Sequence, residues 1–596
     1  MRASCLFILG LVAGCSGIVH SVHARTWYVP DRVATVQAGI NSAADGDTIL
    51  IAPGIYFEHD ITLESAVVIR GDGDDAGDIV IDALGLGRVF DCANQTQPAV
   101  LEGLTITGGY LEGGAFLENR GAGVRCQNGS LILRNCLIRG NSARTGGGLG
   151  ILESSVVLES CSVDSNLATC ENWAGGGGLY AKDSSPELSH CVFRANMVSA
   201  NTPPGDGGAI FCNNSALSAV DCIFLDNSST GGAGGIYLFD ILDPVLTRCH
   251  FEGNSGNGGG ALCLERSSAT LNDCVFRRNR ANLAGAVWMN ELSRPDFIRC
   301  DFQSNIAELY GGGAVDCWLS DPKFTECVFE RNYSSSLGGA LCFGNIARPV
   351  LESCLLVDNE AEVTGGAIFN RISGHPEIIN CTFYGNTATE GAGIYCQEGG
   401  FVTMEQTIVA FSEGAAGLVG FTTATFDLVC CDIFGNEGGD WGGIFGWLLN
   451  RNGNMCVDPL FCAPNDGNYY LNIMSPCLND LECGHLGVYG VGCSFSPTDD
   501  PEPSTARWLR RNRPNPFNPT TQIEVVLPAG RPLEVAIYSV RGSRLATIAR
   551  GDYPAGSHLF TWHGRDDADR ILPSGTYLCR LLAGDRVETA VMTLVR

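Results

Sequence analysis

Residues 274–305 read CVFRRNRANLAGAVWMNELSRPDFIRCDFQSN, and they hold one full period of a repeat. Cys274 is followed two residues later by Phe276 and five residues later by Asn279. The same spacing of cysteine, aromatic residue and asparagine begins again at Cys300. A period of about 20 to 50 residues is typical of a solenoid, in which each repeat contacts only its neighbours.

The period extends on both sides of this stretch. Ten cysteines stand 25 to 31 residues apart, and an asparagine follows each of them by five residues. The cysteines are Cys136, Cys161, Cys191, Cys222, Cys249, Cys274, Cys300, Cys327, Cys354 and Cys381. The asparagines are Asn141, Asn166, Asn196, Asn227, Asn254, Asn279, Asn305, Asn332, Asn359 and Asn386.

Each repeat contains three short apolar segments, separated by glycine pairs, proline and polar residues. Helical periodicity is absent, and a helix would not tolerate the 77 glycines of this chain. Three strands per turn predict an all-β chain wound into a parallel β-helix, whose coils stack about 4.8 Å apart. The asparagine column is expected in a bend, in left-handed backbone geometry, with its amides bonded along the stack.

The composition excludes several functions. The formal net charge is −28, and only Lys182 and Lys323 are lysines, so the chain has no basic surface for phosphates or anionic lipids. We therefore expect no nucleic-acid partner. Hydrophobic residues make up 45% of the 596 residues, enough for a large continuous core.

The first 24 residues have the pattern of a signal peptide, with Arg2 followed by a short apolar run. Cleavage after Ala24 is expected; the alternative is lipidation at Cys15, which ends a lipobox-like sequence. Export follows from either alternative. No later apolar run is long enough to cross a bilayer.

Two resemblances concern the repeat domain, residues 25–493. The segment 34–56, ATVQAGINSAADGDTILIAPGIY, resembles the N-terminal part of pectin-lyase-like right-handed β-helices. The Phe-x-x-Asn and Gly-Gly-Ala motifs resemble the repeats of chlamydial polymorphic outer membrane proteins. These resemblances imply a right-handed β-helix and a monomeric adhesin or binding scaffold for an extracellular glycan or matrix ligand.

A linker rich in Pro, Ser and Asp occupies residues 494–504. Beyond it, residues 505–596 contain PNPFNPTT from Pro514, WHGRDD from Trp562 and SGTYLCRLL from Ser574. These motifs resemble the small Ig-like C-terminal sorting domain of type IX secretion substrates, which is related to the flagellar hook-capping Ig-like domain. The resemblance implies the type IX secretion machinery as a partner and the extracellular space or outer-membrane surface of a Gram-negative bacterium as the location.

The ladder cysteines are expected to be free and to pack in the core, because stacked Cβ atoms about 4.8 Å apart are too distant for a disulfide. Metal binding is not expected, since no Cys-x-x-Cys motif or interleaved histidine accompanies them. Five other cysteines follow the last coil in irregular sequence, and some of them should pair to staple a cap: Cys456, Cys462, Cys477, Cys483 and Cys493.

Candidate ligand-binding acids fall in equivalent turns between two strands of successive repeats: Asp240, Asp243, Glu265, Glu291 and Asp321. A polysaccharide lyase or glycoside hydrolase on this fold would need such clustered acids, and a lyase also a neighbouring base. Acids in exposed turns are more often solvated, so a non-enzymatic adhesin is the leading hypothesis, with a structural surface-layer component as a third alternative. No cofactor is expected, apart from the alternative of Ca²⁺ at the acids of residues 72–78.

Overall fold

The computed structural model describes residues 24–493 and 508–594, apart from 113–118, 171–172, 201–204, 479–482, 510–511, 513–514, 516, 528–529, 540–543 and 585. The expected signal sequence through residue 23, with Cys15, and the linker at 494–504 lie outside the described residues. Within them, no helix has both the length and the hydropathy that crossing a bilayer requires.

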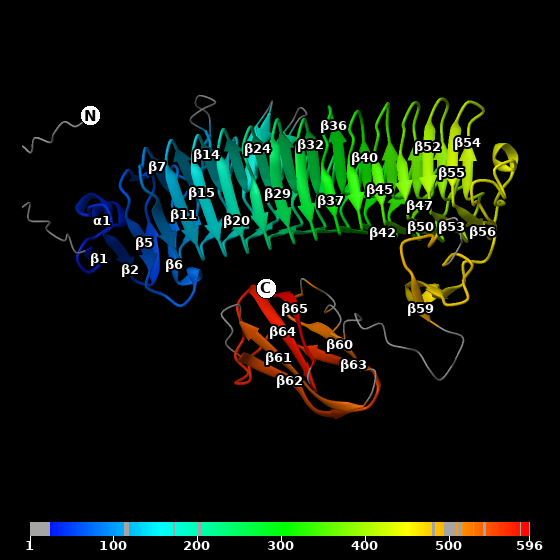
Figure 1. Ribbon diagram of the computed structural model, residues 1–596. Coiled ribbons are helices and arrows are strands. Elements are labelled where there is room, and N and C mark those ends of the chain that lie inside the picture. Colours follow the sequence, from blue (N-terminus) through cyan, green and yellow to red (C-terminus); the bar gives the residue numbers. More distant parts are fainter. Residues whose placement is uncertain are drawn as a thin grey trace, which may run out of the picture.

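Three long parallel sheets wind around one core (Figure 1). In the described residues, sheet A has 16 strands, from β1 (Thr26–Val29) to β55 (Thr425–Val429). Sheet B has 15 strands there, from β3 (Gly54–Phe57) to β56 (Asp432–Phe434), and sheet C has 14, from β4 (Ile61–Leu63) to β54 (Leu418–Gly420). The predicted all-β, right-handed parallel β-helix is confirmed.

One coil shows how the repeat maps onto strands. β32 (Leu262–Glu265) lies in sheet C, β33 (Ser268–Asn272) in sheet A, and β34 (Val275–Arg277) in sheet B. After the asparagine comes β35 (Arg280–Ala281), which belongs to a fourth, short-stranded sheet D that runs from β13 (Ser142–Ala143) to β47 (Glu360–Ala361). The sequence predicted three strands per coil and missed this fourth one.

Two residues with positive φ make the bends on either side of sheet B. Asp273, directly before the ladder cysteine, has φ 54°, as the expected bend requires. Arg278, directly before Asn279, has φ 51°, whereas Asn279 itself does not take a left-handed conformation. The expectation that the asparagine column is left-handed is therefore wrong: the preceding residue makes the turn, and the asparagine side chain is turned into the interior.

A column of stacked phenylalanines fills the core beside sheet B. Successive ring centroids are 4.9 Å apart from Phe251 to Phe276 and 4.7 Å apart from Phe276 to Phe302 and from Phe302 to Phe329. All four rings are fully buried. The parallel strand pairing brings each ring directly over its equivalent in the next coil, for instance Phe276 over Phe302.

Both ends of the stack are covered. Helix α1 (Val36–Ser42) buries Val36 and Ile40 against the first coils. At the other end, Phe445 and Leu448 pack on the last coils, and Trp441 lies partly buried beside them. Trp447, six residues after Trp441, is 61% exposed.

The cysteine-rich segment 456–493 differs from the cap that the sequence predicted. It folds back beside sheet B, where Tyr469, Val488 and Tyr489 pack against Leu355 and Val357, and we call it the strap. Figure 1 shows its strand β59 (Val491–Cys493) below the ends of the last coils. Its other strands are β57 (Phe461–Ala463) and β58 (Asn468–Asn472), and its disulfides are Cys430–Cys483 and Cys462–Cys493.

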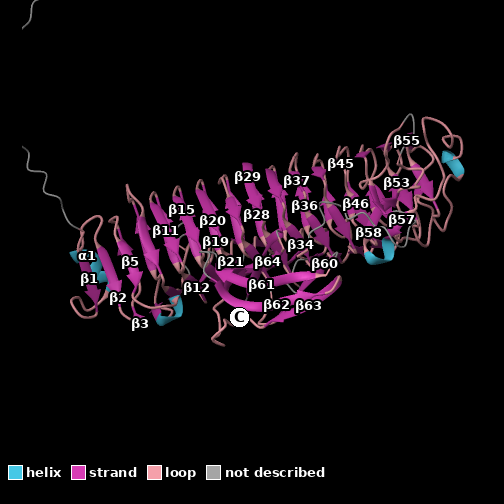
Figure 2. Cartoon of the chain, turned by 60° about the horizontal axis from the view of Figure 1, so that its bottom comes forward, coloured by secondary structure: helices cyan, strands magenta, loops and turns pink. Residues whose placement is uncertain are grey.

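The C-terminal strands form a small β-structure with its own core, separate from that of the β-helix (Figure 2). Strands β60 (Thr521–Leu527) and β63 (Gly556–Trp562) pair with each other. Strands β62 (Arg544–Tyr553), β61 (Arg531–Ser539), β64 (Gly575–Ala583) and β65 (Arg586–Leu594) form an antiparallel sheet in that order. Two packed antiparallel sheets are the architecture expected of an Ig-like domain.

Replacing Phe302 by Ala should lower the free energy of unfolding by about 3–5 kcal/mol, because it opens a cavity between two stacked rings. Urea unfolding followed by fluorescence measures this change. The control is Gln303→Ala, which alters the next, outward-facing residue and should change the free energy by less than about 0.5 kcal/mol. Similar effects of the two substitutions would contradict the assigned inward and outward faces.

Candidate functional site

The predicted asparagine ladder is continuous from Asn141 to Asn386. Asn305 shows its geometry: the backbone N–H and the side-chain Nδ2 both donate to Oδ1 of Asn332, at 3.0 and 2.9 Å. The same Nδ2 donates to the carbonyl of Phe276 in the preceding coil at 2.9 Å. All ten side chains are buried. The ladder therefore satisfies backbone groups inside the bend and leaves no amide for a ligand.

The ten ladder cysteines are free and buried. Each thiol packs between coils; the Cys300 Sγ, for example, donates to the carbonyl of Leu271 at 3.4 Å. Burial raises the pKa of the Cys274 and Cys327 thiols. In the described residues, no group of three or more His, Cys, Asp or Glu side chains is arranged to hold a metal ion.

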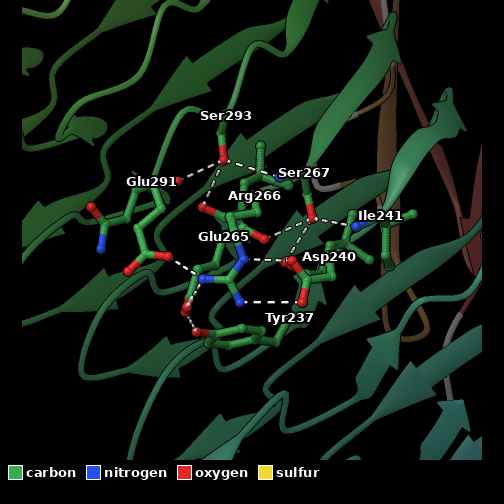
Figure 3. A network of polar contacts seen from close by, with 11 residues as sticks. Tyr237, Asp240, Ile241, Glu265, Arg266, Ser267, Glu291 and Ser293 are labelled. Atoms are coloured by element: carbon green, nitrogen blue, oxygen red, sulfur yellow. Dashed lines mark hydrogen bonds and ion pairs between the residues drawn. The ribbon is translucent and has the colours of Figure 1, made fainter.

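Three of the five predicted acids converge on one guanidinium. Asp240 follows β28 (Ile236–Phe239), Glu265 ends β32, and Glu291 follows β36 (Val287–Asn290), so all three lie in the turn between sheets C and A. Arg266 Nε donates to Asp240 at 2.5 Å, and its Nη1 pairs with both Glu265 (3.3 Å) and Glu291. Figure 3 shows the three acidic side chains around this guanidinium, and we call them together with Arg266 the Arg266 cluster.

Hydrogen bonds hold the Arg266 guanidinium in its charged form. The pKa of Arg266 is raised, first by its hydrogen bonds with Asp240 and also by those with Glu291. The Tyr237 hydroxyl donates to Glu265, and burial raises the pKa of that phenol. Arg266 also lies over the ring of Phe239, 4.4 Å from its centroid. One cation and three carboxylates thus leave a negative patch with fixed acceptor oxygens.

The other two predicted acids lie apart from this cluster. Asp321 accepts the backbone N–H of Arg348 at 2.9 Å and pairs with Arg294 at 3.5 Å. Asp243 is exposed within β29 (Leu242–Thr247), at a residue with φ 59°. The sequence therefore predicted the correct turn but not the division of its acids into separate groups.

Asp206 is a functional candidate that the sequence analysis missed. It is buried, and its carboxylate accepts from Trp173 Nε1 at 2.9 Å and from the backbone N–H of Gly232 at 3.3 Å. Burial, together with the charge of Glu265, raises its pKa to about 6. Its sequence signal was slight: a single acid directly before the glycine pair at residues 207–208.

A ladder of serine hydroxyls under the Arg266 cluster was also missed. The backbone N–H of Ile241 donates to Ser267 Oγ, and that of Ser267 donates to Ser293 Oγ, both at 3.2 Å (Figure 3). The Ser267 hydroxyl in turn donates to the carbonyl of Glu265 at 3.0 Å. A serine recurring at the same place of the repeat in most coils was the signal that could have identified it: Ser154, Ser184, Ser215, Ser267, Ser293 and Ser320.

Two surface hollows and the turn acids near the N-terminus lie away from the Arg266 cluster. One hollow, about 540 Å³, is lined by residues of sheet D and the next turns, including Glu360, Glu362 and Thr387. Near the N-terminus, Asp75 and Asp78 form a capping box on the short helix η1 (Ala76–Asp78). Their carboxylates thus accept backbone N–H groups, which is a sufficient structural role for both.

Comparison with protein families agrees with this architecture. The model described as a right-handed β-helix region matches residues 88–233 and 285–445, more than half of the chain. The chain therefore belongs to this family. The model of the FlgD Ig-like domain matches residues 517–585. A comparison with curated proteins finds no match.

Eight chains of solved structures match. One is the catalytic domain of a GH87 α-1,3-glucanase in complex with nigerose, at 10% identity, 68% coverage of both chains and a TM-score of 0.37. Another is the tailspike protein of the Acinetobacter phage vB_ApiP_P1, at 11% identity, with 91% of this chain and 82% of that chain covered and a TM-score of 0.18. Both likenesses are too weak for any argument about function.

Replacing Asp206 by Asn should flatten the pH dependence of stability. The native carboxyl binds its proton more tightly than the unfolded one, with a pKa of about 6 against 3.8, so its contribution is complete at low pH and is lost as the pH rises through about 6. Wild-type stability should fall across this window by up to about 3 kcal/mol more than that of the variant. Urea unfolding at pH 4 and pH 7 measures the difference, and equal slopes would contradict a protonated, buried Asp206.

Thiol labelling should separate the ladder from the strap. In unreduced, unfolded protein, an alkylating reagent should modify the ladder cysteines together with Cys456 and Cys477, which are free. In native protein it should modify the exposed Cys456 and spare the buried thiols. Peptide mass spectrometry identifies the modified residues. Unreduced labelling of the following cysteines would contradict the two disulfides: Cys430, Cys462, Cys483 and Cys493.

Proposed function

We propose that the chain is an exported, non-enzymatic β-helix protein that acts at the cell surface or after release as an adhesin or binding scaffold. The observation that carries this proposal is the Arg266 cluster. Its carboxylates are held in fixed positions by one guanidinium, and so they offer acceptor oxygens to the hydroxyl groups of a glycan. Acids that are paired with a cation suit binding better than proton donation.

Two features support export as part of this proposal. The disulfide Cys430–Cys483 fastens the strap to the β-helix and Cys462–Cys493 closes a loop within it, and structural disulfides are typical of proteins outside the cytoplasm. The Ig-like domain has its own core, which fits a separate module recognised by the secretion machinery. We assign it the role of a type IX sorting domain that delivers the β-helix across the outer membrane of a Gram-negative bacterium.

A polysaccharide lyase or glycoside hydrolase is the second candidate, and Asp206 is the observation that favours it. A buried acid with a pKa of about 6 lies within electrostatic range of Glu265. Pairs of acids whose environments separate their pKa values serve as acid and base in glycosidases. The binding hypothesis remains first because Glu265 is held by Arg266 and Tyr237.

Binding of the purified chain to a glycan and matrix-protein array tests the first candidate, with a reducing-sugar assay in parallel. Glu265→Gln should weaken the binding of any ligand found by at least about 10-fold, since a charge-assisted bond is lost. The matched control is Asp273→Asn, which alters an acid paired with Arg299 at the bend between sheets A and B. Release of reducing sugar that Asp206→Asn abolishes would favour the enzyme instead.

Export provides the second test. Truncation after Pro503 should leave folded β-helix in the periplasm, because the two cores are separate. Fusion of residues 505–596 to an unrelated exported reporter should carry the reporter to the surface in a host with this pathway. Surface proteolysis measures both results. Normal surface amounts of the truncated chain would assign the terminal domain to another role.

A further inference from the structure

A row of exposed aliphatic side chains runs along the turn between sheets C and A. Leu292, Leu319 and Ile346 occupy equivalent positions in three successive coils, directly before the buried small residues of the serine ladder or its continuation. Their exposed fractions are 72%, 39% and 60%. In the next coil the equivalent position is Ser373, and Ile372 directly before it is 54% exposed. We call Leu292, Leu319, Ile346 and Ile372 the aliphatic row; successive coils stack about 4.8 Å apart.

The backbone makes this row unusual. Leu292, Leu319 and Ile346 have φ values of 67°, 49° and 55°. Left-handed geometry is unfavourable for leucine and a clear outlier for β-branched isoleucine. In earlier coils the same position carries polar or charged residues: Glu153, Asp183, Asn214, Asp240 and Arg266. Strain and exposure both disfavour aliphatic residues at this position.

Charged residues flank the row on its sheet A side, two residues after each aliphatic one. They are Arg294, Asp321 and Arg348, so the charges alternate along the axis. Arg294 and Asp321 form a long ion pair at 3.5 Å, and 67% of the arginine side chain remains exposed. The Arg348 side chain is exposed, and Asp321 accepts its backbone N–H. The flank therefore carries partly exposed charges of both signs beside the aliphatic row.

We propose that the aliphatic row is an interface with a second copy of this chain, in which the two β-helices lie side by side and antiparallel. The two copies are related by a two-fold axis that is perpendicular to the β-helix axis and lies between the levels of Leu319 and Ile346. This axis places Leu319 of each copy against Ile346 of the other. The same axis places Asp321 against Arg348 of the second copy, twice. Because both copies have the same coil rise, the contacts stay in register along the whole row.

The orientation follows from the flanking charges. An axis parallel to the β-helix would set the sheet A flank of one copy against the sheet C flank of the other and leave Asp321 and Arg348 unmatched. The antiparallel arrangement opposes them, and opposite charges across an interface favour the correct register. Four side chains expose a few hundred Å², below the roughly 800 Å² per partner of a stable complex. The association is therefore weak and depends on concentration, in contrast to the monomer that the sequence predicted.

Analytical ultracentrifugation of the full chain over a range of concentrations tests this interface. Ile346→Asn and Leu319→Asn remove the apolar contacts, and asparagine tolerates left-handed geometry. Each should raise the dissociation constant at least about 10-fold while the melting temperature stays constant or rises. The matched control is Glu153→Asn, at the same turn position outside the row, which should change neither quantity.

Charge exchange tests the orientation. Asp321→Arg and Arg348→Asp should each weaken self-association, and the double variant should restore most of it, because the antiparallel contact re-forms with the signs exchanged. Wild-type chain that is monomeric at every concentration would overturn the proposal. So would unchanged self-association of the asparagine variants, or a double variant that associates no better than the single ones.

Discussion

The buried carboxamide of the ladder asparagine is the interaction on which the rest of this structure depends. In each coil the chain must leave sheet B through a tight bend, and a bend inside a stack buries backbone N–H and carbonyl groups. Asn279 accepts from the N–H and Nδ2 of Asn254 and donates to the carbonyl of Phe251, so one side chain satisfies both kinds of group. Without it each bend would hold unpaired polar groups, each costing about 1–3 kcal/mol.

Once the bend is fixed, the remaining columns follow. Parallel pairing puts every side chain over its equivalent in the next coil, so interior positions stack rings on rings and thiols on thiols. The turns between sheets C and A point away from this interior, so stacking in the core does not restrict their side chains. The same left-handed position therefore carries Asp240, then Arg266, then Leu292 in successive coils. The same backbone turn, repeated in successive coils, thus carries both the Arg266 cluster and the aliphatic row.

Much of the fold could be predicted from the sequence because each Cys-Asn period corresponds to one coil of the β-helix. Three features were beyond its reach. Sheet D was missed because a strand as short as Arg280–Ala281 has no alternation to detect. The left-handed residue was misassigned because asparagine tolerates that geometry, whereas its buried side chain is needed for the ladder. The partner of Cys483 was missed because Cys430 stands beside the ladder-like Cys431.

The candidate site was predictable only in part, for a similar reason. Equivalent turns bring acids of neighbouring coils together, and this follows from the period alone. Which of them meet depends on a long side chain: Arg266 reaches both the preceding and the following coil, and so it gathers Asp240 and Glu291 but not Asp321. Asp206 approaches the same place from the glycine-rich side of sheet C, which no spacing of acids indicated.

The strap offers a comparison for the uncovered aliphatic row. Sheet B also carries apolar side chains on its outer face, including Leu355 and Val357, and there the chain covers them with its own residues 456–493. The strap is fastened by the disulfide Cys430–Cys483 and by backbone hydrogen bonds such as that from Gly487 to Gln406, and Cys462–Cys493 closes a loop within it. A long segment of the chain therefore shields the apolar outer face of sheet B at this point. On the turn between sheets C and A, Leu292 and Ile346 receive no such cover, although their backbone geometry disfavours aliphatic residues. A surface that the fold does not cover, and that its local geometry disfavours, is best explained by a contact outside the chain.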